Sequence, residues 1–184
     1  VFRTVLVTLI ATAACGTRQQ EDPLAGYKRA LAGTVTAEIE TIDAGSNTEK
    51  DAVRRFVAFY EVYSVERVRA HVREVYADNA YFRDSSGEFS GIDAVEKYLL
   101  TAAEGMEECR IDFQDIARHD GHYYFRWIMK YQVRRNPNRP LDEAVGMSHV
   151  RFDRAGKVVF QNDYLDSGSL AHEHVPVIGW LFRR

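Results

Sequence analysis

The spacing of apolar positions along this chain changes near residue 105. Before that point, three stretches carry apolar residues about every 3.6 positions, the period of a helix with one buried face. They are residues 51–64 (DAVRRFVAFYEVYS), 65–76 (VERVRAHVREVY) and 92–105 (IDAVEKYLLTAAEG). Thr48 to Asp51 and Ser90 to Asp93 have the pattern of a capping box, and Ser64 can cap the second helix. The sequence therefore predicts three helices in its first part.

After residue 105 the apolar period falls to two, which is typical of strands. Strands are predicted over 108–117, 122–135, 143–152 and 157–165, and residues 77–91 predict an earlier hairpin around Ser85-Ser86-Gly87. One face of the 122–135 strand is large and apolar, with Tyr123, Phe125, Trp127, Met129 and Tyr131, while the other is mostly polar. Helices followed by an antiparallel sheet covered on one side predict an α+β fold.

The N-terminal residues 1–14 have the layout of a secretory signal, with one early cation and an apolar run too short to span a bilayer. The segment Ala13-Ala14-Cys15-Gly16 resembles the lipobox of bacterial lipoproteins, in which the cysteine is acylated, although Thr12 stands where leucine is usual. The alternatives are plain secretion or a buried N-terminal strand with Cys15 in the core. The resemblance implies a signal peptide over 1–14, lipidation at Cys15, and attachment to the cell envelope.

Residues 15–46 lack a sustained apolar period, so they are predicted to be a tether with a short helical piece near Leu24–Leu31, and the folded domain is predicted over 47–184. Gly16 is not the aspartate that favours inner-membrane retention, which implies the outer membrane if the host has one. The membrane would then be a partner through the lipid anchor alone.

The net charge and the number of cysteines argue against a nucleic-acid partner and an internal disulfide. The chain of 184 residues has a formal net charge of −3, which becomes more negative when Arg3 is removed with the signal. This mildly acidic balance argues against a nucleic-acid partner. Cys109 is the only other cysteine, so a lipidated Cys15 leaves no partner for an internal disulfide, and Cys109 is predicted to be a core residue.

Four strings in this chain resemble the nuclear-transport-factor-2-like superfamily, which includes SnoaL-like cyclases and ketosteroid isomerases. They are RRFVAFYEVYSVERVRAHVREVYADNAYFRD, SGIDAVEKYL, SHVRFDRAGKVV and the DYLD ending, which PVIG follows further on. The resemblance implies a cone-shaped, curved antiparallel sheet packed on three helices around an apolar cavity. A cavity of that kind suits a small hydrophobic ligand.

The isomerase comparison places Asp84 on the first hairpin, where ketosteroid isomerases carry their general base. It places Phe56 and Ser148 where those enzymes carry the tyrosine and the protonated aspartate of their oxyanion hole. Phenylalanine has no donor to offer and a serine hydroxyl is weaker than a neutral carboxylic acid, so ketosteroid isomerase activity is not expected.

Aligning the GKVV turn makes Gln161, Asp163 and Leu165 face the cavity. SnoaL-like cyclases are thought to use an aspartate near this strand as acid and base, which makes Asp163 the first catalytic candidate and Asp84 the second. An apolar setting would raise the pKa of such a carboxyl towards a useful range. The alternative is that Asp163 only accepts hydrogen bonds and shapes the cavity mouth. The residues predicted to line the ligand pocket are Phe56, Tyr60, Tyr63, Trp127, Met129, Ser148, Val150 and Gln161.

Two further signals lie near the C-terminus. His172 and His174 could bind zinc on a strand, but no third ligand lies nearby, so neither a metal nor a cofactor is expected. The apolar segment 175–184 (VPVIGWLFRR) could cover one end of the cone, pack in a homodimer, or rest on a membrane. The leading hypothesis is a tethered lipoprotein that binds a small hydrophobic ligand. The alternatives are an acid/base enzyme of isomerase, cyclase or hydratase type using Asp163 or Asp84, and an interaction domain using the outer sheet face.

Overall fold

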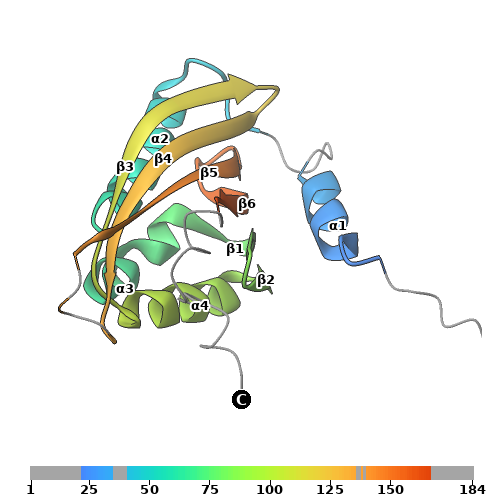
Figure 1. The fold of residues 1–184 in the computed structure, drawn as a ribbon. Helices are drawn as coiled ribbons and strands as arrows, with labels where there is room; N and C mark the ends of the chain where they lie inside the picture. The colour runs from blue at the N-terminus through green and yellow to red at the C-terminus, as the bar shows by residue number, and fades with distance from the viewer. Residues whose placement is uncertain (1–21, 35–40, 136–137, 139, 167–184) are drawn as a thin grey trace, which may run out of the picture.

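The computed structural model describes residues 22–34, 41–135, 138 and 140–166. In chain order the elements are α1 (Ala25–Gly33), α2 (Asn47–Glu61), α3 (Val65–Val75), β1 (Tyr76–Asp84), β2 (Gly87–Ser90), α4 (Ile92–Glu104), β3 (Met106–His119), β4 (His122–Val133), β5 (Asp142–Phe152) and β6 (Val158–Leu165). The strands form one six-stranded sheet in the order β2-β1-β6-β5-β4-β3. Figure 1 shows the long β3–β4 hairpin curving over α2, α3 and α4. The predicted α+β fold, a curved sheet packed on helices, is confirmed.

Of the three N-caps predicted for α2, α3 and α4, one is confirmed and two lie at other residues. Ser64 caps α3 as predicted, because its side chain accepts a hydrogen bond from the Arg67 amide. The N-cap of α2 lies two residues earlier than predicted, because the Ser46 hydroxyl accepts from the Glu49 amide at 3.0 Å. The Glu49 carboxylate accepts from the amide of Gly45, the residue before the cap, at 2.5 Å. For α4 the cap is Gly91 at φ +83°, a backbone that favours glycine, so no serine cap forms there.

The sheet was expected to be antiparallel, but it is mixed, because β1 and β6 run parallel while the other neighbouring strands are antiparallel. In the parallel pair Phe82 lies opposite Gln161 and Arg83 opposite Asn162. Parallel neighbours finish at the same edge of a sheet, so Asp84 at the end of β1 and Asp163 near the end of β6 are brought together. This pairing joins the two halves of the candidate site.

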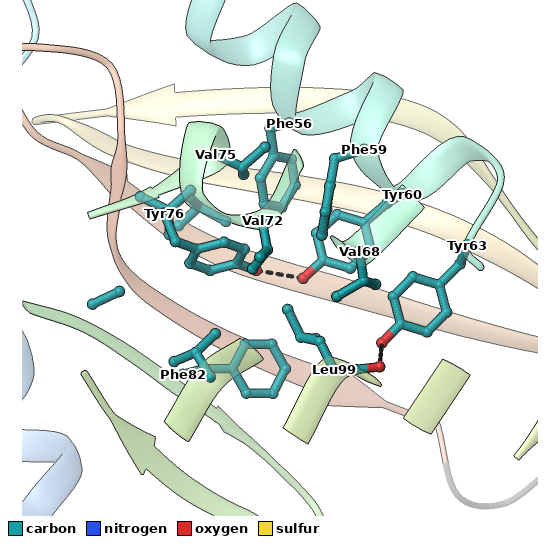
Figure 2. Packing of buried hydrophobic residues seen from close by; sticks show 14 of the residues in the cluster. Phe56, Phe59, Tyr60, Tyr63, Val68, Val72, Val75, Tyr76, Phe82 and Leu99 are labelled. Atoms are coloured by element: carbon teal, nitrogen blue, oxygen red, sulfur yellow. Dashed lines mark hydrogen bonds between the residues drawn. The ribbon is translucent and has the colours of Figure 1, made fainter. Parts of the chain in front are cut away.

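The core lies between the concave face of the sheet and the helices α2, α3 and α4. On α2, Phe56 is 1% exposed and its ring centroid lies 4.6 Å from that of Phe125 on β4. On α3, Val68, Val72 and Val75 belong to the same buried cluster, and Figure 2 shows Val72 and Val75 near Phe56 and Val68 near Tyr60 and Tyr63. Each such side chain contributes roughly 1.5–3 kcal/mol when it is fully buried. The face of β4 predicted to be apolar is the face that meets this core.

The outer face of β5 and β6 is partly covered by the segment that contains α1. The Tyr27 ring packs against Phe160 at 5.7 Å between centroids, and the Arg151 guanidinium donates to the Thr34 carbonyl oxygen at 3.0 Å. Thr41 then pairs with Asp153 as an isolated bridge. The short helix expected near Leu24–Leu31 is therefore present, and it makes side-chain contacts with the sheet.

This covering changes the setting of two histidines. His149 is on the outer face of the sheet but is only 4% exposed, and its Nε2 lies 2.7 Å from Nδ1 of His122. Burial, then the nearby His122 and Arg151, lower the pKa of His149 to about 4. The ring of His122 is held between His149 and Arg151. Among the described residues, no helix is long and apolar enough to cross a membrane.

Candidate functional site

A cavity of about 100 Å³ lies between α4, the end of α2 and the concave face of the sheet. Sixteen residues line it, most of them apolar or aromatic: Tyr60, Tyr63, Phe82, Asp84, Ser85, Tyr98, Leu99, Ala102, Met106, Cys109, Ile111, Trp127, Met129, Tyr131, Asp163 and Leu165. Pockets for drug-sized ligands usually measure roughly 300–1,000 Å³. The space therefore suits a compact molecule.

Both catalytic candidates and half of the predicted pocket residues line this cavity. Asp84, Asp163 and Leu165 face it, as do the predicted Tyr60, Tyr63, Trp127 and Met129. Parts of the chain that are far apart in sequence thus meet at one space. The alternation along β4 indicated Trp127 and Met129, whereas the family resemblance indicated the two aspartates.

The other four predicted pocket residues do not line the cavity, and this part of the prediction is wrong. Phe56, Ser148, Val150 and Gln161 are each at most 4% exposed and lie behind the cavity wall. Trp127 itself lines the cavity, and its Nε1 donates to the hydroxyl of the buried Ser148 at 3.0 Å. Alternation along a strand reports which face a side chain is on, and not how many layers of atoms separate it from open space.

Several lining residues were missed. Tyr98, Leu99 and Ala102 come from α4, and Met106, Cys109 and Ile111 come from β3. Tyr131 shares the face of Trp127 and Met129, so the two-residue period of β4 could have identified it. Nothing in the sequence of α4 indicates which of its apolar residues reaches the cavity.

Asp163 is a cavity group whose altered pKa falls near neutral pH. Burial raises the pKa of its carboxyl to about 7, and the nearby Asp84 charge adds to this, while hydrogen bonds from Ser148 and Gln161 oppose it. The Gln161 amide donates to the two carboxyl oxygens at 2.9 and 3.1 Å. At neutral pH this group can therefore both hold and release a proton.

Asp84 has a different hydrogen-bonding environment at the end of β1. One of its oxygens accepts from the Ser86 amide at 2.7 Å, and the other accepts from the Tyr98 hydroxyl. The Tyr98 ring stacks on Phe89, with centroids 4.1 Å apart. These contacts hold Asp84 in the turn between β1 and β2 while its side chain still lines the cavity.

A buried network of hydroxyls and one amide lies behind Asp163. The Tyr76 hydroxyl donates to the Gln161 carbonyl oxygen at 2.5 Å and also bonds the Tyr60 hydroxyl, a contact drawn in Figure 2. Because the amide oxygen accepts from tyrosine, the amide nitrogen must face Asp163. Burial raises the pKa of Tyr60 and Tyr76 well above the usual value, so both stay protonated. The network thus orients Gln161, and Gln161 orients Asp163.

Two other polar groups of the cavity are hydrogen-bonded within the protein or stay protonated. The Tyr63 hydroxyl donates to the Leu99 carbonyl oxygen at 2.7 Å, as Figure 2 shows. Burial raises the pKa of the Cys109 thiol to about 12, so it stays protonated, and it is buried as predicted. Within the described part of the chain, no group of histidine, cysteine and acidic side chains is arranged to hold a metal ion. His172 and His174, like Cys15 and residues 175–184, lie outside the described residues.

Comparison with known proteins agrees with this architecture. The sequence model of the SnoaL-like domain matches residues 53–161, more than half of the chain. The chain belongs to the SnoaL-like family. A search of curated proteins returned no match.

Solved structures of similar fold extend the comparison. A protein from Agrobacterium tumefaciens, described as a candidate isomerase of the SnoaL-like family, is 17% identical, with a TM-score of 0.53 over 66% of this chain and 99% of its own. A candidate SnoaL-like polyketide cyclase from Jannaschia sp. CCS1 is 11% identical, with a TM-score of 0.57 over 74% and 97%. A hypothetical protein from Catenulispora acidiphila with a ketosteroid isomerase-like fold, solved with trimethylamine, is 14% identical, with a TM-score of 0.55 over 69% and 95%. At these identities the likeness concerns the fold.

Proposed function

We propose that this SnoaL-like protein binds a small, compact hydrophobic molecule in the cavity between α4 and the sheet. The observation that carries the proposal is the cavity itself, an apolar and aromatic space into which two aspartates project their carboxyl groups. A mostly apolar hollow with a few polar groups is the usual form of a small-molecule site. The apolar wall would supply the affinity, and Asp84 and Asp163 would orient a polar group of the ligand.

The test is native mass spectrometry of the full chain, purified without denaturant, beside two variants of α4. Ala102 lines the cavity, so Ala102→Leu adds bulk inside it, whereas Thr101 on the same helix lies outside it and Thr101→Leu serves as the matched control. We expect a small molecule to accompany the parent and the control and to be lost from Ala102→Leu. A molecule retained equally by all three proteins would be bound elsewhere, and the cavity proposal would fail.

Acid/base catalysis is the second candidate, and the acidity of Asp163 favours it. A carboxyl with a pKa of about 7 can exchange a proton with a bound substrate at neutral pH, and Gln161 holds it in place. The structural neighbours described as a candidate isomerase and a candidate polyketide cyclase name reactions that move protons. In this protein Asp163 would transfer the proton, and Asp84 would hold the polar end of the substrate.

Deuterium exchange distinguishes this candidate from binding alone. The molecule that accompanies the protein would be incubated with it in D₂O, and deuterium at carbon would be followed by NMR. Catalysis predicts exchange with the parent and at least a hundredfold slower exchange with Asp163→Asn, the range expected for a general acid or base. Exchange at the same rate with both proteins would remove Asp163 from the reaction.

The lipid anchor at Cys15 and the cell-envelope location belong to the same proposal. They are supported by the order of residues 1–16, an apolar run followed by Ala13-Ala14-Cys15-Gly16. Mass analysis of the N-terminal peptide from protein made in a bacterial host would detect acylation, with Cys15→Ser as the control. An N-terminal peptide that keeps residues 1–14 and carries no added mass would refute it.

A further inference from the structure

The charged side chains that line the cavity are all acidic. Of the described residues that line it, two are aspartates and none is lysine, arginine or histidine. The nearest basic residue in the sequence, Arg83, is on the opposite face of β1, where it donates to Asn162 at 3.0 Å and lies over the Tyr27 ring. Buried carboxylates are normally matched by a cation or a metal because their desolvation is costly. Here the described protein supplies no such partner within the cavity.

The aromatic wall is of a kind that also favours a cation. Tyr60, Tyr63, Tyr98 and Trp127 line the same space from α2, from the α2–α3 connection, from α4 and from β4. Their polar atoms are already engaged within the protein: for example, the Tyr63 hydroxyl bonds Leu99 and the Trp127 nitrogen bonds Ser148. What these residues present to a ligand is therefore mainly ring surface, and aromatic rings attract organic cations through their quadrupoles.

We propose that the ligand of this cavity is a compact lipophilic amine, bound as its ammonium ion with the nitrogen between Asp84 and Asp163 and its apolar part against the aromatic wall. This inference rests on the proposed function, since it names the ligand class of the same site. A carboxylic acid would add a third negative charge with no cation to receive it. A neutral ligand would fill the space but would leave both carboxyl groups without a cation.

The two remaining ligand classes differ in what happens to the proton of Asp163. An ammonium ion requires the ionised carboxylate, so its binding releases a proton and its affinity rises with pH up to about 7, the pKa of the free group. A neutral acceptor such as an alcohol or a carbonyl requires the protonated carboxyl, so its affinity falls over the same range. The other titratable groups around Asp163 include Asp84 and the side chains of Tyr60, Tyr63, Tyr76, Tyr98 and Cys109. Burial raises the pKa of the last five, so they stay neutral.

The experiment uses three probes of one shape, namely benzylamine, benzyl alcohol and benzoate, with binding to the full chain measured by calorimetry between pH 5.5 and pH 8. We expect benzylamine to bind most tightly, to release a proton when it binds, and to gain about thirty-fold in affinity across this range. Asp163→Asn should weaken benzylamine at least tenfold and remove its pH dependence, while it changes benzyl alcohol less than threefold. Asp43→Asn, a change at an exposed aspartate away from the cavity, should leave all three affinities unaltered.

The possible outcomes distinguish failure of the amine proposal from failure of the binding function. Suppose that benzyl alcohol binds as tightly as benzylamine and that its affinity falls as the pH rises. The proposal of an amine ligand would then be wrong, while the proposed binding function would still hold. Tight binding of benzoate would also overturn the amine proposal. If none of the three probes binds to a protein whose circular dichroism shows it folded, the binding function itself fails, and the amine with it.

Discussion

Replacing Asp163 by asparagine should remove a cost of folding that depends on pH. In an unfolded chain an aspartate has a pKa near 3.9, whereas burial raises the pKa of Asp163 to about 7 in the folded protein. Between these two values the folded protein keeps a proton that the unfolded chain has lost. Raising the pH therefore favours the unfolded chain over this interval, and below pH 4 and above pH 7 the contribution no longer changes.

The size of the effect follows from the shift. One pKa unit corresponds to about 1.4 kcal/mol, so a shift of this size lowers the free energy of unfolding by roughly 2–3 kcal/mol between pH 5 and pH 8. Asparagine has no proton to lose, and its side-chain oxygen can still accept the hydrogen bond from Gln161. The parent should thus lose stability relative to Asp163→Asn as the pH rises from 5 to 8.

Urea unfolding followed by circular dichroism at pH 5 and pH 8 measures this difference directly. Groups that titrate identically in both proteins cancel when the variant is compared with the parent. Asp43→Asn serves as the control, because Asp43 is exposed, and its stability relative to the parent should be the same at both pH values. A parent-to-Asp163→Asn difference that moves by less than about 0.5 kcal/mol between the two pH values would show that Asp163 is not held in a desolvated setting, and the account of the site would be wrong.

Four further substitutions, one of them a control, test the packing and the α3 cap by the same unfolding measurement. Phe56→Ala should cost about 3–5 kcal/mol, because the ring is 1% exposed in the core; a loss below 1 kcal/mol would contradict this. Gly146→Ala should cost about 1–3 kcal/mol and shift tryptophan fluorescence, because a Cβ there would lie 2.1 Å from the indole of Trp127, whereas Gly33→Ala, with nothing within 4 Å, should be neutral or stabilising. Ser64→Ala should cost about 1 kcal/mol through loss of the α3 cap, and an unchanged midpoint would show that the cap contributes nothing.

Much of the fold could be predicted because local patterns determine local structure. The apolar period marks α2, α3 and α4, and the switch to a period of two marks β3 to β6. The cap of α3 at Ser64 was correct, while those of α2 and α4 were displaced by one to two residues, since several polar residues precede each helix and only backbone geometry selects one. The attachment of α1 to the outer face could not be predicted, because it depends on single contacts such as Tyr27 with Phe160.

In the candidate site, too, some residues could be predicted from the sequence and others could not. Asp84 and Asp163 were singled out by the resemblance to isomerases and SnoaL-like cyclases, and both line the cavity. Ser148 and Gln161 were predicted to line it too, but they lie one layer deeper, where they hold the carboxyl of Asp163. Tyr98, which donates to Asp84, was not predicted at all. Contacts between α4 and β1 are long-range, and no period in either segment encodes them.

By itself, the sequence determined which segments are helices and strands and which face of each is apolar, because these properties depend on residues a few positions apart. Only the tertiary structure decided that β1 lies parallel to β6, which sets two distant aspartates at one edge of the sheet. It also decided how deeply Asp163 is buried, and so its pKa of about 7, since desolvation depends on every side chain packed around the carboxyl. The sequence alone therefore predicts an ordinary pKa for an aspartate, and only its surroundings in the fold raise that pKa.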